Sequence, residues 1–99
     1  MKNIILEKAT LNIIKGKEKE FEKNFLKAEK FIKKAKGYIS HELHKSAKYE
    51  NIYLLLVKWQ TIKDHQEGFR NSADYQEWKK LLHHFYNPFP EVKYFELIS

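Results

Sequence analysis

Cysteine is absent from this 99-residue chain, and glycine and proline are scarce, with three and two residues. Without cysteine there is no disulfide, no thiol nucleophile and no thiolate metal site, which excludes several enzyme classes and fits a reducing cellular interior. The glycines Gly16, Gly37 and Gly68 lack the spacing of loops that cradle phosphates. The sequence therefore predicts no nucleotide cofactor and favours the cytoplasm.

Long apolar runs are also missing. No stretch approaches the roughly 18 consecutive apolar residues that a bilayer span needs. Near the N-terminus, Glu7 interrupts the apolar segment before a signal-peptide core could form. We expect a soluble, cytoplasmic protein without a membrane partner.

Positive charge is in excess, formally +6 at pH 7, but it is not gathered in one segment. Between residues 15 and 36, lysines alternate with Glu18, Glu20, Glu22 and Glu29, a pattern typical of a solvated helix face. A charge excess without a recognition motif is weak evidence for nucleic-acid binding. The sequence predicts no nucleic-acid partner.

The length suits one hydrophobic core and is too short for two. Hydrophobic residues make up 42% of the chain and aromatic residues 15%, which is enough for a packed interior. We expect residues 1–99 to form a single domain.

Periodicity predicts a strand and then a helix in the first part. Residues 4–14 are rich in aliphatic residues and stop at Lys15-Gly16, as a strand would. Residues 17–36 carry apolar side chains at steps of three and four, which places them along one helix face, and Gly37 can end the helix. These apolar residues are Phe21, Phe25, Ala28, Ile32 and Ala35.

Four further elements follow. Residues 38–45 alternate in polarity and residues 52–59 are almost continuously apolar, which predicts two strands of a hairpin. Thr61 and Ser72 suit the starts of two helical segments, the second of which ends before a proline. Residues 92–98 predict the last strand.

This order predicts an α+β, ferredoxin-like βαββαβ fold, in which helices cover one face of an antiparallel sheet. The other face would carry Ile4, Leu6, Ile14 and half of the third strand. Such an apolar patch is larger than soluble monomers usually expose. We therefore expect a homodimer in which two sheets pack face to face.

Four short segments carry a resemblance over nearly the whole chain: Gly37-Tyr38-Ile39-Ser40-His41-Glu42-Leu43, Trp59-Gln60-Thr61, Phe69-Arg70-Asn71-Ser72-Ala73-Asp74-Tyr75 and Phe85-Tyr86-Asn87-Pro88-Phe89-Pro90. With the order of elements, they resemble antibiotic biosynthesis monooxygenase domains. The resemblance implies a dimeric α+β barrel with a pocket between sheet and helices. Members include cofactor-free oxygenases of aromatic polyketides or quinols, and a haem-degrading branch.

Departures from the family pattern bear on chemistry. The haem-degrading branch of the family that this chain resembles carries asparagine, tryptophan and histidine at three positions where this chain has Ala9, Phe69 and Lys79. Lysine is a poor ligand for haem iron at neutral pH. The quinol-oxidising members often carry histidine where this chain has Phe69, and another near Asp74. The comparison implies no haem and no other cofactor.

His65 is the candidate catalytic residue. It lies between Ile62 and Phe69 on the helix face expected to point inward, where a near-neutral base could deprotonate a phenol or enol that then reacts with oxygen. The alternative is a structural histidine bonded to a backbone carbonyl. His83 and His84 lack the spacing of metal ligands, so we expect no metal, and His83 is expected to face water.

Four aromatic residues are candidates for substrate binding, because the family keeps its site in this region: Trp59, Phe69, Tyr75 and Tyr86. At helical spacing such residues are also typical of a core. The resemblance thus implies a cofactor-independent monooxygenase that takes molecular oxygen and a small aromatic, polyketide or quinol-like substrate. The alternative is a non-catalytic, ligand-binding or stress-associated dimeric barrel.

Overall fold

The computed structural model describes residues 4–99, and residues 1–3 lie outside the described part. Its elements are β1 (Ile5–Asn12), α1 (Glu18–Lys33), β2 (Tyr38–Lys45), β3 (Ile52–Trp59), η1 (Asp64–Phe69), α2 (Ala73–Leu82), η2 (His83–Phe85) and β4 (Val92–Glu96). This order confirms the predicted ferredoxin-like α+β fold. The extent of the domain over residues 1–99 stays a prediction.

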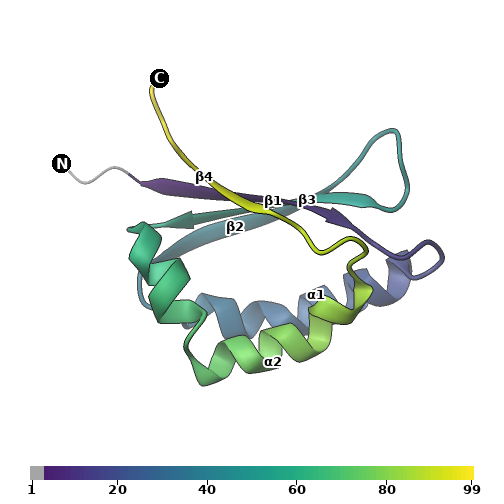
Figure 1. Ribbon diagram of the computed structural model, residues 1–99, viewed down its shortest axis with the longest axis horizontal. Coiled ribbons are helices and arrows are strands. Elements are labelled where there is room, and N and C mark those ends of the chain that lie inside the picture. The colour runs from purple at the N-terminus through teal and green to yellow at the C-terminus, as the bar shows by residue number, and fades with distance from the viewer. Residues whose placement is uncertain (1–3) are drawn as a thin grey trace.

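The four strands form one antiparallel sheet in the order β2-β3-β1-β4. Both α-helices lie on the same side of this sheet (Figure 1). In the central strand β1, Glu7 stands opposite Val57 of β3 and Tyr94 of β4, so these three side chains share one face. That face is the one covered by the helices, since Val57 is fully buried.

The core fills the space between this face and the helices. Alternate residues of β1 and β3 point into it, and α1 contributes Phe21, Phe25, Ala28 and Ile32, which are all buried as their spacing predicts. The helix ends at Lys33, three residues earlier than the periodicity indicated. Gly37 then adopts φ +82°, and a Cβ there would overlap the side chain of Asp64.

A π-helix, η1, connects β3 to α2. The helical turn that leads into η1 begins at Ile62, and before it the Thr61 hydroxyl accepts a hydrogen bond from the Asp64 N–H at 3.1 Å. The Arg70 N–H donates to the His65 carbonyl oxygen at 3.1 Å, a bond between residues five apart. Arg70, His65 and Phe69 all line the same cavity.

The opposite face of the sheet carries no helix (Figure 1). Ile4 is 49% exposed and Phe95 45% exposed on this side, where Leu6, Leu54 and Leu56 are half-buried. Within residues 4–99, no helix is both long and apolar enough to cross a bilayer.

Candidate functional site

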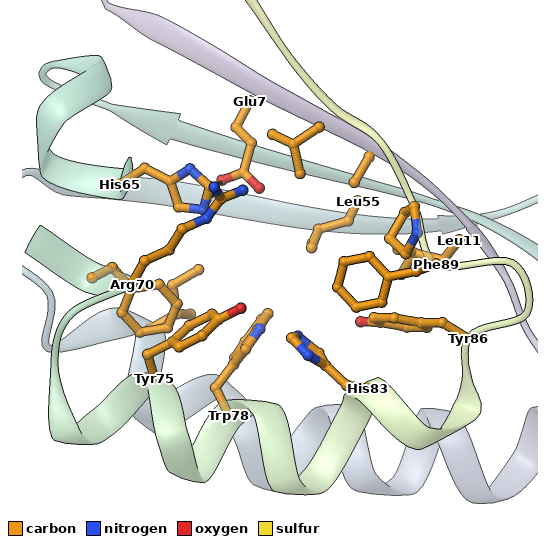
Figure 2. A pocket seen from close by; sticks show the side chains of 15 residues that line it. Glu7, Leu11, Leu55, His65, Arg70, Tyr75, Trp78, His83, Tyr86 and Phe89 are labelled. Atoms are coloured by element: carbon orange, nitrogen blue, oxygen red, sulfur yellow. Dashed lines mark ion pairs between the residues drawn. The ribbon is translucent and has the colours of Figure 1, made fainter. Parts of the chain in front are cut away.

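A cavity of about 270 Å³ lies between the helix-covered face of the sheet and the segments η1, α2 and 86–90. Figure 2 shows aromatic side chains around it, with Glu7 and His65 at one end and Tyr86 and Phe89 at the other. Its aromatic lining consists of Phe69, Tyr75, Trp78, Tyr86 and Phe89, together with the histidines His65 and His83. This hollow is the candidate site.

Glu7 brings a carboxyl group into this apolar surrounding from the middle of β1. The residue is only 5% exposed. Its Oε1 accepts a hydrogen bond from the Trp59 indole N–H at 2.8 Å. The second oxygen, Oε2, makes no hydrogen bond within residues 4–99, where every fully enclosed side-chain nitrogen or oxygen has a partner. Oε2 is therefore open to the cavity.

Burial raises the pKa of Glu7 from its ordinary 4.5 to about 7, because a carboxylate loses solvation in this place. The hydrogen bond from Trp59 and the positive charge of Arg70 both oppose the rise. The carboxyl thus gains and loses a proton near neutral pH, which is the range in which a general base is most effective.

His65 lies beside this carboxyl and is itself 5% exposed. Its Nδ1 is hydrogen-bonded to the Tyr94 hydroxyl at 2.5 Å, rather than to a backbone carbonyl. Its Nε2 stands 3.5 Å from Oε1 of Glu7, which is beyond an ordinary hydrogen bond. Burial, and then the charge of Arg70, lowers the pKa of His65 to about 4. Its imidazole is therefore neutral at pH 7.

Because burial disfavours charge on both groups, Glu7 and His65 do not form an ion pair at neutral pH. Between about pH 4 and pH 7 a neutral carboxyl faces a neutral imidazole. Above pH 7 the carboxyl ionises while the imidazole stays neutral. The pair can thus take up one proton from a molecule in the cavity.

The two tyrosines predicted for substrate binding both line the cavity. Figure 2 shows the Tyr75 and Tyr86 hydroxyls directed into it. Burial raises the pKa of Tyr86, assisted by the nearby Tyr75 and Glu7, and burial also raises that of Tyr75. Both phenols stay protonated at neutral pH and can donate hydrogen bonds to a ligand.

His83 was expected to face water, and this prediction is wrong. Its ring lies 5.7 Å from that of Tyr75, 5.5 Å from Tyr86 and 5.0 Å from Phe89, in the wall of the cavity. The reason is that α2 ends at Leu82 and tightens into the 3₁₀ turn η2, which changes the direction of the following side chain. Burial, then the charges of Lys79 and Arg70, lowers the pKa of His83 to about 4.

The other two predicted substrate residues differ in position. Phe69 lines the cavity. Trp59 does not; it is fully buried behind the wall, with its ring 5.3 Å from that of His65 and 6.0 Å from that of Phe69. It acts on the site through the hydrogen bond that it donates to Glu7.

The sequence analysis missed Glu7, Arg70 and His83. Two of these residues are unusual in the sequence. Glu7 is the single charged residue on the face of β1 that otherwise carries apolar side chains, and Arg70 is the single arginine of the chain. An isolated charge on a buried strand face and a lone arginine both suggest a site. His83 carried no such signal, because its direction depends on where α2 ends.

Within the part of the chain that the structure describes, no three histidine, aspartate or glutamate side chains are placed to hold a metal ion. The arrangement suits proton transfer to a buried carboxyl in an aromatic cavity. Fold and site together define a ferredoxin-like α+β protein with a partly open aromatic cavity beside the buried pair Glu7 and His65.

Comparison with known proteins places this chain in a family. The sequence profile of the antibiotic biosynthesis monooxygenases matches residues 4–81, and the chain belongs to this family. The uncharacterized protein YczJ of Bacillus subtilis (strain 168) is 52% identical over 93 residues, which cover 94% of this chain and 98% of YczJ.

Solved structures agree with this assignment. A candidate antibiotic biosynthesis monooxygenase of Bordetella bronchiseptica superposes with a TM-score of 0.94 at 32% identity, covering 98% of this chain and 99% of that one. SnoaB of Streptomyces nogalater, described as a cofactor-independent oxygenase, superposes with a TM-score of 0.84 at 15% identity, over 98% of this chain and 95% of SnoaB. At that identity, SnoaB shares the fold alone.

Proposed function

We propose that this protein is a cofactor-independent oxygenase that binds a small planar aromatic or quinol-like molecule in the cavity and oxidises it with molecular oxygen. The observation that carries the proposal is the open Oε2 of Glu7, whose pKa of about 7 makes it a suitable base inside an aromatic cavity. Membership of the family and the description of SnoaB as a cofactor-independent oxygenase support the same class of reaction. A cytoplasmic location stays a prediction.

The reaction begins with proton transfer. A ring methylene or hydroxyl of the substrate gives its proton to Glu7, and the resulting carbanion or enolate reduces oxygen and forms a carbon–oxygen bond. For a ring methylene, the peroxide takes up a proton and loses water, which leaves a carbonyl group. One oxygen atom enters the product and the other leaves as water, and the methylene carbon supplies all four electrons.

His65 takes part in this proposal as the partner of Glu7. When the Tyr94 hydroxyl donates to Nδ1, the imidazole proton is on Nε2 and faces Oε1 of Glu7. This arrangement favours the ionised carboxyl over the neutral one. Glu7, which holds the proton taken from the substrate, can then return it to the peroxide, while the His65 Nε2–H faces the carboxylate that this leaves.

A non-catalytic ligand-binding protein is the second candidate. The observation in its favour is that His65 is buried and hydrogen-bonded, as a structural histidine would be. In that case the cavity binds an aromatic molecule and no oxygen is consumed.

Oxygen consumption separates the two candidates. With a panel of quinols, flavonoids and anthrones, we expect the protein to consume oxygen with at least one compound that it also binds. His65→Ala should reduce this uptake about a hundredfold, whereas His84→Ala, which changes an exposed histidine, should not. Binding without oxygen uptake across the panel would establish the ligand-binding alternative.

We also propose that two copies associate through the open sheet face. Ile4, Leu6, Leu54, Leu56 and Phe95 lie on this face, where the exposed lysines Lys8, Lys58 and Lys93 stand among them. Ile4 and Phe95 are large apolar side chains about half exposed to water. A second copy of the chain, in face-to-face contact, would remove this surface from water.

Changing the centre of this face should give a monomer. Leu54 stands opposite Thr10 and His44, and Leu54→Lys would place two like charges in the interface. We expect sedimentation velocity to report a dimer for the wild type and a monomer for Leu54→Lys. Leu26→Lys, at a 71% exposed position of α1, is the matched control and should stay dimeric. A monomeric wild type at micromolar concentration would disprove the dimer.

A further inference from the structure

Arg70 is the only arginine among the 19 basic residues of the chain, and it stands at the rim of the cavity. The π-type turn of η1 holds its backbone above His65. Figure 2 shows the side chain extended from the end of η1 toward Glu7 and His65. Its position is thus set by the local fold and not by a partner on the surface.

The Arg70 guanidinium has no partner of its own within residues 4–99. It makes no ion pair shorter than 4.0 Å and no side-chain hydrogen bond there, although its charge acts on Glu7, His65, Tyr75 and His83. The lysine charges that lie close to carboxylates are elsewhere on the surface. Five N–H donors in a planar fork are therefore available at the rim.

We propose that the ligand of the cavity is a planar aromatic acid, whose ring enters the aromatic cavity and whose carboxylate binds the Arg70 guanidinium. This inference rests on the proposed function and narrows its substrate class. A guanidinium binds a carboxylate through two parallel hydrogen bonds, which fixes the orientation of the attached ring. The ring would then present its reactive carbon toward Oε2 of Glu7.

The charges around the cavity favour an anion. His65 and His83 are neutral at pH 7, and the phenols of Tyr75 and Tyr86 are protonated hydrogen-bond donors. Glu7 is the one acidic side chain in the lining, and burial holds it partly protonated at pH 7. A bound carboxylate therefore meets one full positive charge and at most a partial negative charge.

The cavity volume of about 270 Å³ limits the size of this acid. Ligand pockets usually begin at roughly 300 Å³, so the cavity suits one or two fused rings, with part of the ligand at the rim. Since Arg70 is exposed, water screens its charge, and we expect its contribution to be about tenfold in affinity rather than a thousandfold.

The experiment compares two probes of equal shape, 1-naphthoate and its neutral amide 1-naphthamide, by isothermal titration calorimetry at pH 7. We expect the wild type to bind the carboxylate about tenfold more tightly than the amide. Arg70→Gln should remove this preference and leave amide binding unchanged. Lys63→Gln, which removes the same charge at an exposed position close by, should keep the preference.

The outcomes separate this inference from the proposed function. Equal binding of both probes by the wild type, binding of neither at millimolar concentration, or a preference retained in Arg70→Gln would each overturn the role of Arg70. Oxygen uptake with neutral anthrones would then still support an oxygenase. Conversely, an Arg70-dependent preference without oxygen uptake by any compound would support the aromatic acid and reject the oxygenase.

Proton uptake provides a second measurement at the same site. Glu7 faces His65, Arg70, Tyr75, Tyr86 and Tyr94, and of these only Arg70 is charged at pH 8. A carboxylate bound to Arg70 cancels that charge, so the pKa of Glu7 rises and a fraction of a proton is taken up. Calorimetry in two buffers of different ionisation enthalpy should detect this uptake for 1-naphthoate in the wild type and not in Glu7→Gln. Equal uptake in both proteins would contradict binding beside Glu7.

Discussion

Glu7→Gln is expected to stabilise the folded protein by about 3 kcal/mol at pH 8 and to reduce oxygen uptake about a hundredfold or more. The gain in stability and the loss of oxygen uptake both follow from the removal of an ionisable carboxyl group. At pH 8 the wild-type protein holds an ionised carboxylate in a place where burial disfavours charge. The glutamine amide has no charge to desolvate, and its carbonyl oxygen can still accept the hydrogen bond from Trp59. It cannot accept a proton from a substrate.

The stabilisation should depend on pH with a definite sign. The pKa of Glu7 is 4.5 before folding and about 7 after it, so the folded chain binds more protons between these two values. The stability contributed by the neutral carboxyl is complete below pH 4.5 and is lost as the pH rises through 7. Urea unfolding should thus give similar free energies for wild type and Glu7→Gln at pH 4.5, and a difference of about 3 kcal/mol at pH 8.

A matched substitution removes the effect of net charge. Glu50 is an exposed residue of the turn between β2 and β3, and Glu50→Gln changes the net charge by the same amount. This control should change stability by less than about 0.5 kcal/mol at either pH. A Glu7→Gln protein that is less stable than the wild type at pH 8, or that retains full oxygen uptake, would show that Glu7 has a structural role only.

His65 has the opposite dependence on pH. Burial lowers its pKa from 6.5 to about 4, so the stability that its neutral form contributes is present above pH 6.5 and lost as the pH falls toward 4. His83 behaves in the same way. In the wild type, the pH dependence of stability that comes from His65 and His83 opposes the one that comes from Glu7. In Glu7→Gln only the contributions of the two histidines remain. The variant should therefore become steadily more stable between pH 4 and 6.5.

Trp59→Phe should raise the pH at which oxygen uptake reaches half its maximum by about one unit. The indole N–H stabilises the ionised form of Glu7, and phenylalanine has no donor to replace it. Trp59 is fully buried, so the smaller ring should also cost about 1 to 3 kcal/mol of stability. The pH profile is the decisive measurement, because a packing defect alone does not move it.

Trp78→Phe is the matched control for this prediction. Trp78 is also buried and lines the cavity, but it makes no hydrogen bond to Glu7. Its replacement should cost a similar free energy of unfolding and leave the midpoint of the pH profile in place. An equal shift in both variants would mean that Trp59 does not act through Glu7.

The sequence predicted the strands at residues 38–45 and 52–59 with the boundaries that β2 and β3 have. It also predicted the buried face of α1 and the Ser72 cap of α2, where the Ser72 hydroxyl accepts a hydrogen bond from the Tyr75 N–H at 3.1 Å. These features are local: they follow from side chains a few residues apart, whose spacing can be read directly. The order of these elements predicted the ferredoxin-like fold, and the family resemblance agreed with it.

The candidate site was predicted less completely. Phe69, Tyr75 and Tyr86 were placed near a pocket, and they line one. The spacing of aromatic residues along a helix could not separate cavity wall from packed core, because both have the same period. Trp59, at the end of β3, was also placed near the pocket and is fully buried behind its wall. Glu7 was passed over because one carboxyl in a strand gives no indication of what will cover it.

The sequence by itself determined which segments form helices and strands, and that a buried face of β1 carries one carboxyl group. Only the tertiary structure decided that Glu7 meets Trp59, 52 residues away, and His65 on η1. Those contacts set the chemistry, because the pKa of a carboxyl depends on the solvent it loses and the donors it gains when distant segments close over it.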